Sequence, residues 1–513
     1  MLAKVITSAL VGLNAVPVEV EVDIASQGLP SFTIVGLPDK AVEEAKERVR
    51  SAIRNTGADF PARRITVNLA PADLPKEGPI YDLPIALGIL LASGQIKSDT
   101  GDAIFAGELS LDGSLRGVNG VLSQALMARS LGLKRAFFPA MNAREASLVQ
   151  EVAIYPVASL HELFLHLSGQ AVISETVPTH LNDHVINFVS EYDMKDIKGQ
   201  HLAKRALEIA AAGGHNILFK GPPGAGKTLL ARTLPTIMPP LTFDEALEVT
   251  NIYSISGQLD GKGVMTNRPF RSPHHTTSLV GIIGGSSNPR PGEITLAHRG
   301  VLFLDEFPEF PRSVLEALRQ PIEDGVVTIS RANGKVSFPT RCMIVAAHNP
   351  CPCGYLGDKT HECRCMPGQI LRYQKKLSGP ILDRIDIHLD VPAIPVERLT
   401  DRDSGEGTES SEKIRSRVIH ARTRQSARFK KTSLISNSEM TSKHIKEFVE
   451  LSDACIQLLK TAVVKFNLSG RSYHRVIKLG RSIADLADSD ELLPQHIAEA
   501  LQFRPRRDTS FSN

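Results

Sequence analysis

A short apolar strand followed by a glycine-rich loop constrains the fold of this chain more than any other feature. Residues 216–220 (NILFK) have the pattern of a buried strand, and a helical segment (LLARTL) follows the loop. The loop fits the pattern GxxxxGK(S/T) and consists of Gly221, Pro222, Pro223, Gly224, Ala225, Gly226, Lys227 and Thr228. Backbone N–H groups of such a loop, and the N-terminus of the following helix, bind phosphate groups. The sequence therefore predicts an α/β P-loop domain that binds ATP, with Lys227 on the phosphates and Thr228 on Mg²⁺.

Two further apolar strands end in polar residues. Residues 300–304 (GVLFL) are followed by Asp305 and Glu306, and residues 343–348 are followed by Asn349. The carboxyl ends of parallel strands meet at one edge of a sheet, where sheets of this kind bind their ligands. We expect Asp305 to bind Mg²⁺ and Glu306 to polarise the attacking water. Asn349 is expected to hold that water near the γ-phosphate.

Length and charge limit the classes of protein that fit. A chain of 513 residues exceeds what one hydrophobic core serves, so two or three domains are expected. The net charge is only +3, so a nucleic-acid surface would have to come from local clusters of basic residues. The longest apolar stretch, residues 83–92, is about half as long as a membrane span and contains a proline. The N-terminal segment lacks a cleavage site and runs into an alternating strand pattern, so we expect a cytoplasmic protein.

Pattern and composition change several times along the chain. Strands alternate with helices at the N-terminal end, where Asp39 is expected to cap a helix. A weakly patterned linker, longer α/β units, an acidic segment expected to be mobile, and a mostly helical segment follow. The expected segments are residues 1–167, 168–192, 193–400, 401–412 and 413–513.

Four stretches carry a resemblance to a known family. They are RSPHHTTS (271–278), NPRPGEITLAHRGVLFLDEFPEF (288–310), NPCPCGY (349–355) and SGPILDRIDIHLDVP (378–392). They closely resemble the ComM/YifB family of magnesium-chelatase-like AAA+ ATPases, and the likeness covers essentially the whole chain. It implies an AAA+ core with a helical lid, a homo-hexameric ring, and ATP-driven helicase activity. The partner would be DNA, branched or single- or double-stranded, and branch migration during natural transformation would extend the heteroduplex of incoming DNA.

The resemblance also implies roles for two arginines. Arg384 lies where ring ATPases of this branch place the arginine finger that reaches a neighbour's γ-phosphate. Arg471 matches the sensor arginine of the lid, with Arg475 as the second candidate. The alternatives are a surface arginine paired with Asp383 or Asp386 in the first case, and a basic helix face in the second.

The N-terminal segment resembles the catalytic region of Lon-type proteases. PKEGPIYDLPIALG matches the Lon segment that carries the serine nucleophile, and LDGSLRGVNG matches the segment that carries the lysine. Ile80 stands at the serine position and Arg116 at the lysine position. Isoleucine offers no nucleophile and arginine stays charged, so we expect a Lon-like fold without protease activity.

The cysteines predict a metal site. Cys351, Cys353, Cys363 and Cys365 form two CxC arms, and four thiolates satisfy tetrahedral Zn²⁺. His361 is a substitute for one ligand, and reduced or redox-active thiols are the alternative. CxC is a less usual arm than CxxC.

Two basic features are candidates for DNA contact. Residues 326–338 have the pattern of a β-hairpin with an Asn-Gly turn, and in this ATPase branch a hairpin there projects into the pore. Arg331 and Lys335 beside its tip suit a phosphate backbone, although a solvated tip remains the alternative. Residues 413–431 contain eight Lys or Arg and are either a solvated helix or a second DNA contact.

The residues leave two functions open. The first is a DNA-translocating ring ATPase, and the second is a chelatase-type chaperone that remodels a protein partner. An ATP-dependent protease is excluded by the missing Ser–Lys pair. DNA stimulation of ATP hydrolysis would separate the two remaining functions.

Overall fold

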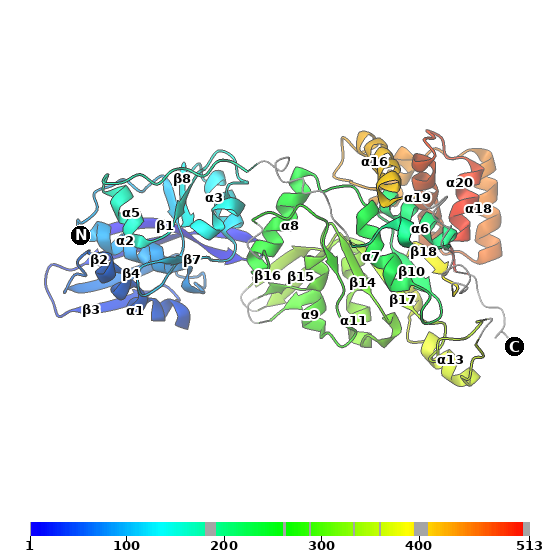
Figure 1. Ribbon diagram of the computed structural model, residues 1–513, viewed down its shortest axis with the longest axis horizontal. Coiled ribbons are helices and arrows are strands. Elements are labelled where there is room, and N and C mark those ends of the chain that lie inside the picture. The colour runs from blue at the N-terminus through cyan, green and yellow to red at the C-terminus, as the bar shows by residue number, and fades with distance from the viewer. Residues whose placement is uncertain are drawn as a thin grey trace. The chain divides into compact units, whose positions relative to one another are not determined.

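A computed structural model describes residues 2–179, 191–259, 263–286, 289–331, 334–358, 361–393 and 409–505. The chain forms two compact units (Figure 1). The first consists of Met1–Val185 together with Thr242–Thr266, and the second of Ile186–Leu241 together with Asn267–Asn513. Both units combine helices with sheets, which confirms the predicted α/β class.

The first unit is built on a seven-stranded mixed sheet. Alternating residues of the central strands point into the core, as Val18, Val20 and Val22 do. The strand order is β3 (Ser31–Val35), β4 (Arg64–Ala70), β2 (Asn14–Ile24), β1 (Leu2–Val11), β5 (Ala103–Phe105), β8 (Arg135–Pro139) and β9 (Ala153–Val157). A two-stranded ladder joins β6 (Glu108–Leu109) to β7 (Leu115–Arg116).

Helices of the first unit pack on this sheet. The predicted helix α1 (Lys40–Asn55) begins as expected, because the carboxylate of Asp39 accepts a hydrogen bond from the Val42 N–H at 2.8 Å. Helix α2 (Asp82–Ala92) is apolar all round and lies against β1 and β2. The remaining helices are α3 (Val121–Ser130), α4 (Ala143–Ala146), α5 (Leu160–Leu167) and α8 (Phe243–Ser256).

Helix α8 comes from the middle of the chain, in a range that sequence patterns assign to the ATPase core. Its Asn251 accepts a hydrogen bond from the Ser123 hydroxyl of α3 at 2.6 Å, and the Ser254 hydroxyl accepts one from the Gly120 N–H at 3.1 Å. Thr242 and Glu245 form a capping box at its start. These polar contacts place residues 242–266 with the first unit.

The second unit contains a five-stranded sheet whose paired strands are all parallel. Both faces are covered, so the strands are apolar throughout, as in β14 and β17. The order is β11 (Phe270–Arg271), β14 (Val301–Leu304), β17 (Met343–His348), β10 (Ile217–Lys220) and β18 (Ile387–Asp390). Two hairpins are β12–β13 (Gly284–Gly285 and Arg290–Pro291) and β15–β16 (Val326–Arg331 and Gly334–Pro339). The helices around this sheet are α6 (His201–Gly213), α7 (Lys227–Ile237), α9 (Leu279–Ile283), α10 (Glu293–Leu296), α11 (Arg312–Ala317), α12 (Arg319–Asp324), α13 (Pro367–Gln374) and α14 (Gly379–Leu382).

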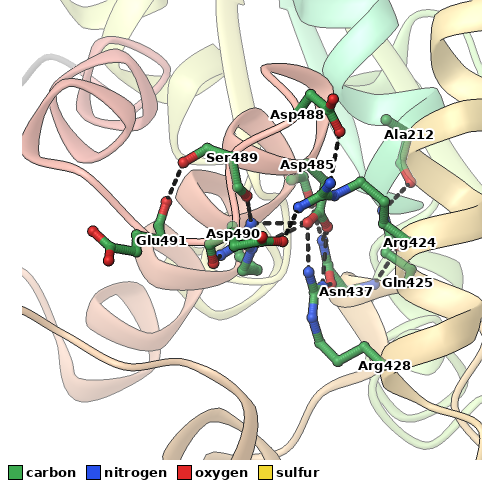
Figure 2. A network of polar contacts seen from close by, with 12 residues as sticks. Ala212, Arg424, Gln425, Arg428, Asn437, Asp485, Asp488, Ser489, Asp490 and Glu491 are labelled. Carbon is green, nitrogen blue, oxygen red and sulfur yellow. Dashed lines mark hydrogen bonds and ion pairs between the residues drawn. The ribbon is translucent and has the colours of Figure 1, made fainter.

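The C-terminal helices of this unit are held together by buried ion pairs. They are α16 (Ser411–Arg428), α17 (Ser442–Phe448), α18 (Asp453–Phe466), α19 (Gly470–Leu486) and α20 (Pro494–Gln502). Figure 2 shows Arg428 of α16 directed at Asp485 of α19, which is fully buried. Arg424 pairs with Asp488 and Asp490 in the same network.

Most basic side chains of residues 413–431 therefore form hydrogen bonds or ion pairs within the protein. Intramolecular partners are found for Lys413, Arg417, Arg422, Arg424 and Arg428. Neither predicted interpretation included this outcome, since one expected solvated side chains and the other DNA contacts. Residues 394–408, which include most of the acidic segment, lie outside the described part of the chain.

Candidate active site

The P-loop joins the carboxyl end of β10 to the N-terminus of α7. Gly224 and Gly226 have φ angles of 76° and 83°, in the left-handed region that favours glycine. A Cβ atom on Gly221 would lie 2.1 Å from the carbonyl oxygen of Val391, so this position admits no larger residue. The glycines thus permit both the turn and the close approach of β18 to the loop.

Lys227 crosses this loop with its side chain buried. Its Nζ donates to the carbonyl oxygens of Gly221 and Pro222 at 2.7 and 2.8 Å, and to Oδ1 of Asn349 at 3.0 Å. Burial lowers the pKa of the Lys227 ammonium, and Asp305 acts in the opposite direction. The hydrogen bond to Asn349 brings two sequence-predicted residues together, since Asn349 follows β17 and Lys227 starts α7.

Thr228 and Asp305 offer oxygen ligands at one point. The Thr228 hydroxyl donates to Oδ2 of Asp305 at 3.1 Å, although the two residues are far apart in sequence. Hydroxyl and carboxylate oxygens are ligands that Mg²⁺ prefers, and it is held by few protein groups beside substrate phosphates. The residues present therefore fit the Mg²⁺ that an ATPase uses.

Glu306 has an unusual backbone and a histidine partner. Its φ is 50°, which is uncommon for a residue with a side chain and is a feature of functional sites. Its Oε2 lies 3.0 Å from Nδ1 of His275, which follows β11, and its side chain is 59% exposed. Sequence reasoning did not single out His275, although the stretch RSPHHTTS that contains it was a visible signal.

The strand ends meet as the sequence predicts. Lys220 at the end of β10 is in register with His348 of β17, and Leu304 of β14 with Ala346 of β17. The P-loop, Asp305 and Asn349 consequently lie along the carboxyl edge of the sheet. Burial lowers the pKa of His348 to about 4, so this residue is neutral beside Lys227 at physiological pH.

Arg384 lies at the opposite, amino edge. It precedes β18, and its carbonyl oxygen accepts a hydrogen bond from Nδ2 of Asn216, the residue before β10, at 3.2 Å. Its guanidinium bonds to Glu323 and donates to the carbonyl oxygens of Arg319 and Pro380 at 3.1 and 2.7 Å. The side chain is 11% exposed. Its acidic partner is thus Glu323, not Asp383 or Asp386 as the alternative interpretation expected.

The two candidate sensor arginines of α19 differ in their surroundings. Arg471 is 61% exposed, and its Nη2 lies 3.3 Å from Oε1 of Glu323. Arg475 pairs with the buried carboxylate of Asp386 at 3.0 Å. Asp386 also accepts from the backbone N–H of Asn216 at 3.2 Å, so Arg475 ties α19 to the sheet.

The chain is similar to known proteins over nearly its whole length. Family descriptions match three parts of the chain: "Magnesium chelatase, subunit ChlI" over residues 193–399, "Subunit ChlI of Mg-chelatase" over 20–142, and "Magnesium chelatase, subunit ChlI C-terminal" over 408–504. Competence protein ComM of Haemophilus influenzae is 45% identical over 506 residues, which cover 98% of this chain and 97% of that protein. YifB of Salmonella typhimurium and YifB of Escherichia coli, both described as uncharacterized, are each 43% identical over 505 residues, again 98% and 97% of the two chains.

The chain belongs to the ComM/YifB family. Its nucleotide site is that of a magnesium-chelatase-like AAA+ ATPase, which uses ATP and Mg²⁺. Among the described residues, no helix combines the length and apolar character that a membrane span requires.

In this ComM/YifB family member the four predicted cysteines cluster. The Sγ atoms of Cys351, Cys353 and Cys363 are 3.4, 3.6 and 3.7 Å apart, and all four Sγ atoms, including that of Cys365, lie within 4.8 Å of one another. Zn²⁺ with Zn–S bonds of about 2.3 Å would separate tetrahedral sulfurs by about 3.8 Å. The thiols therefore fit a zinc ion closely. The His361 ring instead lies against Tyr355 in a tilted arrangement, with ring centroids 4.8 Å apart.

The cysteine cluster lies beside the nucleotide site. Asn349 is two residues from Cys351, and Gly354 lies between the first two cysteines and the rest of the loop. A Cβ atom on Gly354 would lie 2.5 Å from Cδ of Pro223 in the P-loop. The loop that carries the cysteines therefore packs directly on the phosphate-binding loop.

The residues at the Lon positions cannot supply Ser–Lys chemistry. Ile80 is buried, and the exposed Arg116 lies 3.5 Å from Glu108. The nearby carboxyl of Asp82 is fully buried against Arg48, and burial raises its pKa to about 6.

The predicted hairpin is present as β15–β16. Its strands pair from Val326 opposite Pro339 to Arg331 opposite Gly334. Lys335 is exposed, as a DNA contact requires. The side chain of Arg331 and residues 332–333 lie outside the described part of the chain.

Proposed function

We propose that this protein is an ATP-driven DNA motor that works as a homo-hexameric ring and migrates branched DNA during recombination. The observation that carries the proposal is the intact P-loop site in a chain that resembles a competence protein over nearly its whole length. Natural transformation is the corresponding process. The proposed compartment is the cytoplasm.

The residues of the carboxyl edge divide the work of hydrolysis. Lys227 draws the β- and γ-phosphates into the loop. Thr228 and Asp305 would hold Mg²⁺, which would neutralise charge on the transferring phosphoryl group. Glu306 accepts the proton of the attacking water, and His275 at 3.0 Å fixes the direction of that carboxylate. Asn349 positions the same water, since its amide oxygen already contacts Lys227.

The separation of Arg384 from the P-loop supports a ring. Arg384 lies before the amino end of β18, whereas the P-loop follows the carboxyl end of the neighbouring β10. The intervening four-residue strand is about 10 Å long. A finger on the far edge serves the nucleotide of an adjacent copy, and each site is complete only at an interface. Arg471 contacts Glu323, which also contacts Arg384, so the two arginines lie on the same face of the unit. We propose that Arg471 assists the finger and that α16–α20 form the lid.

Three further assignments belong to this proposal. The β15–β16 hairpin contacts the DNA backbone through Lys335 and Arg331 inside the pore. Cys351, Cys353, Cys363 and Cys365 would hold Zn²⁺, and the bound ion would keep their loop in the shape that packs on Pro223. The N-terminal unit is a Lon-like domain without protease activity that serves ring assembly or DNA contact.

A chelatase-type chaperone is the second candidate, because the matching family descriptions are those of a magnesium chelatase subunit. Such a protein would remodel a protein partner. Its ATP hydrolysis would respond to that partner and would be indifferent to DNA.

The test measures ATP hydrolysis by the purified protein with and without forked DNA, over a range of salt concentrations. Stimulation that weakens as salt rises supports the motor, because phosphate contacts release counterions. The Lys227→Ala variant provides the background rate, and Glu306→Gln should retain ATP without turning it over. Robust hydrolysis that no DNA structure changes would reject the motor in favour of the chaperone.

A further inference from the structure

Two arginines from distant parts of the chain share one carboxylate. Glu323 of α12 bonds through Oε2 to Nη2 of Arg384 and through Oε1 to Nη2 of Arg471, the latter at 3.3 Å. Arg384 comes from the segment before β18, and Arg471 from the first turn of α19. Their guanidinium groups are thereby brought to the two oxygens of one anion.

This arrangement has the chemistry of a phosphate site. A terminal phosphate presents several oxygens and more negative charge than a carboxylate, and guanidinium groups bind both kinds of anion in the same geometry. Glu323 is 44% exposed and Arg471 is 61% exposed, so the ion pair between them is weak and exchangeable. An incoming γ-phosphate can therefore replace the carboxylate.

Arg384 is held more firmly than Arg471. Besides Glu323 it has two backbone acceptors, the carbonyl oxygens of Arg319 and Pro380, and it is mostly buried. Its positive charge is neutralised while Glu323 stays in contact. A finger in this state contributes less to the stabilisation of a charged transition state than a free one.

Glu323 belongs to a helix that is hydrogen-bonded to the base of the hairpin. It lies two residues before Gly325, whose carbonyl oxygen accepts from the Thr340 N–H at 2.8 Å, and Thr340 follows β16. The Thr340 hydroxyl donates to the carbonyl oxygen of Pro321 in α12 at 3.3 Å. A displacement of the hairpin is consequently transmitted to α12 and to Glu323.

We propose that Glu323 is a positioning residue that stands in for the neighbour's γ-phosphate. It gathers Arg384 and Arg471 on one face and withholds the charge of Arg384 until DNA moves the hairpin. The proposal rests on the assignment of Arg384 as the finger in the proposed function. Beyond the proposed function, it identifies Glu323 as the residue through which DNA bound at the hairpin controls ATP hydrolysis at the adjacent site.

The test compares Glu323→Gln with the parent in kcat and KM for ATP, with and without forked DNA. Glutamine keeps the shape but not the charge, so the basal kcat should rise about fivefold, the equivalent of about 1 kcal/mol for an exposed ion pair. The stimulation by DNA should fall by the same factor, and KM should stay within about twofold, because Glu323 does not touch the nucleotide of its own chain. Glu323→Asp retains the charge and should lie between the two.

A matched control is Glu499→Gln. Glu499 of α20 pairs with Arg205 of α6 at 2.8 Å, so this variant also removes an ion pair between a C-terminal helix and the rest of the unit, and it should change neither rate. The effect of Glu323→Gln should vanish when Arg384 is also replaced by alanine.

A basal kcat for Glu323→Gln that is unchanged or reduced would overturn the inference, as would an effect that persists without Arg384. These outcomes differ from a failure of the proposed function. An Arg384→Ala variant that hydrolyses ATP at the parental rate would show that Arg384 is not a finger at all.

Discussion

Two inactive variants should restore activity to one another when they share a ring. Lys227→Ala lacks the ammonium that binds the phosphates, whereas Arg384→Ala lacks the finger and should lose about 10³-fold or more in kcat. The structure places the two residues at opposite edges of one sheet, with four-residue β10 between them. In the proposed ring, each catalytic site would take Lys227 from one chain and Arg384 from the next.

The size of the recovery follows from this geometry. In a mixture that assembles at random, an interface is productive when its P-loop chain is the Arg384→Ala variant and its finger chain is the Lys227→Ala variant. At equal amounts this holds for about one quarter of the interfaces of a closed ring. Hydrolysis should rise from near background to about one quarter of the parental rate, and should fall on either side of the equal mixture.

The assay uses the two variants with different affinity tags, refolded into mixed rings or co-expressed, and purified over both tags. Steady-state ATP hydrolysis is measured across mixing ratios. A chain with both substitutions, mixed with the Arg384→Ala variant, is the control and should give no recovery, because neither partner supplies a finger. Mixed rings that remain inactive at every ratio would refute a finger acting between chains.

Three further predictions concern separate parts of the protein. Replacing Arg331 and Lys335 by alanine should leave basal ATP hydrolysis intact while reducing DNA stimulation, and the log–log salt slope of DNA binding should fall by about one unit for each DNA phosphate that the protein no longer binds. Metal analysis should find about one Zn²⁺ per chain, and Cys363→Ser should lose it and raise the KM for ATP, because the cysteine loop packs on the P-loop. Burial acts to raise the pKa of the Asp386 carboxyl, but Arg475, with Lys478, outweighs it and holds that pKa well below its ordinary value. The ionised carboxylate therefore stabilises the fold above about pH 4, and this stabilisation is lost as pH falls further. Asp386→Asn should therefore cost about 3–5 kcal/mol in the free energy of unfolding at pH 7, and urea titrations should show that cost shrinking toward pH 3.

The sequence predicted the arrangement of the P-loop and the strand ends, because the signals for this arrangement are local and reinforce one another. The P-loop needs glycines at fixed positions, and an apolar strand before it leaves few alternatives. Asp305 and Asn349 follow two similar strands, so a parallel sheet brings them to one edge without further information. The observed contacts of Lys227 with Asn349 and of Thr228 with Asp305 agree with that expectation.

Other features depended on contacts between residues that are distant in sequence. The segment at residues 2–11 lacks a clear strand pattern, yet β1 pairs along its whole length with β2. Glu323 belongs to an unremarkable polar stretch, and the stretch RSPHHTTS does not show which of its residues would contact Glu306. Both His275 and Glu323 are identified only by their partners in the fold. The arginines of α16 are a similar case. The sequence shows a basic helix, but it does not show that Asp485 of α19 and Glu208 of α6 pair with its arginines.

Helix α8 shows most clearly that local sequence signals predict a helix but not what it packs against. Its capping box at Thr242 and its glycine at position 257 predict the start and the end of a helix. Neither signal carries information about the surface on which the helix packs. Its assignment to the N-terminal unit comes from tertiary contacts, among them the hydrogen bonds from Ser123 to Asn251 and from the Gly120 N–H to Ser254. The chain therefore leaves the nucleotide-binding sheet after α7 and returns to it at β11, with a helix of the other unit between. Because α7 begins at Lys227 and β11 leads to His275, both ends of this excursion connect to residues of the nucleotide site. The N-terminal unit is consequently tied by covalent structure to the elements that bind ATP, which is a physical reason to expect that its removal would disturb the ATPase itself.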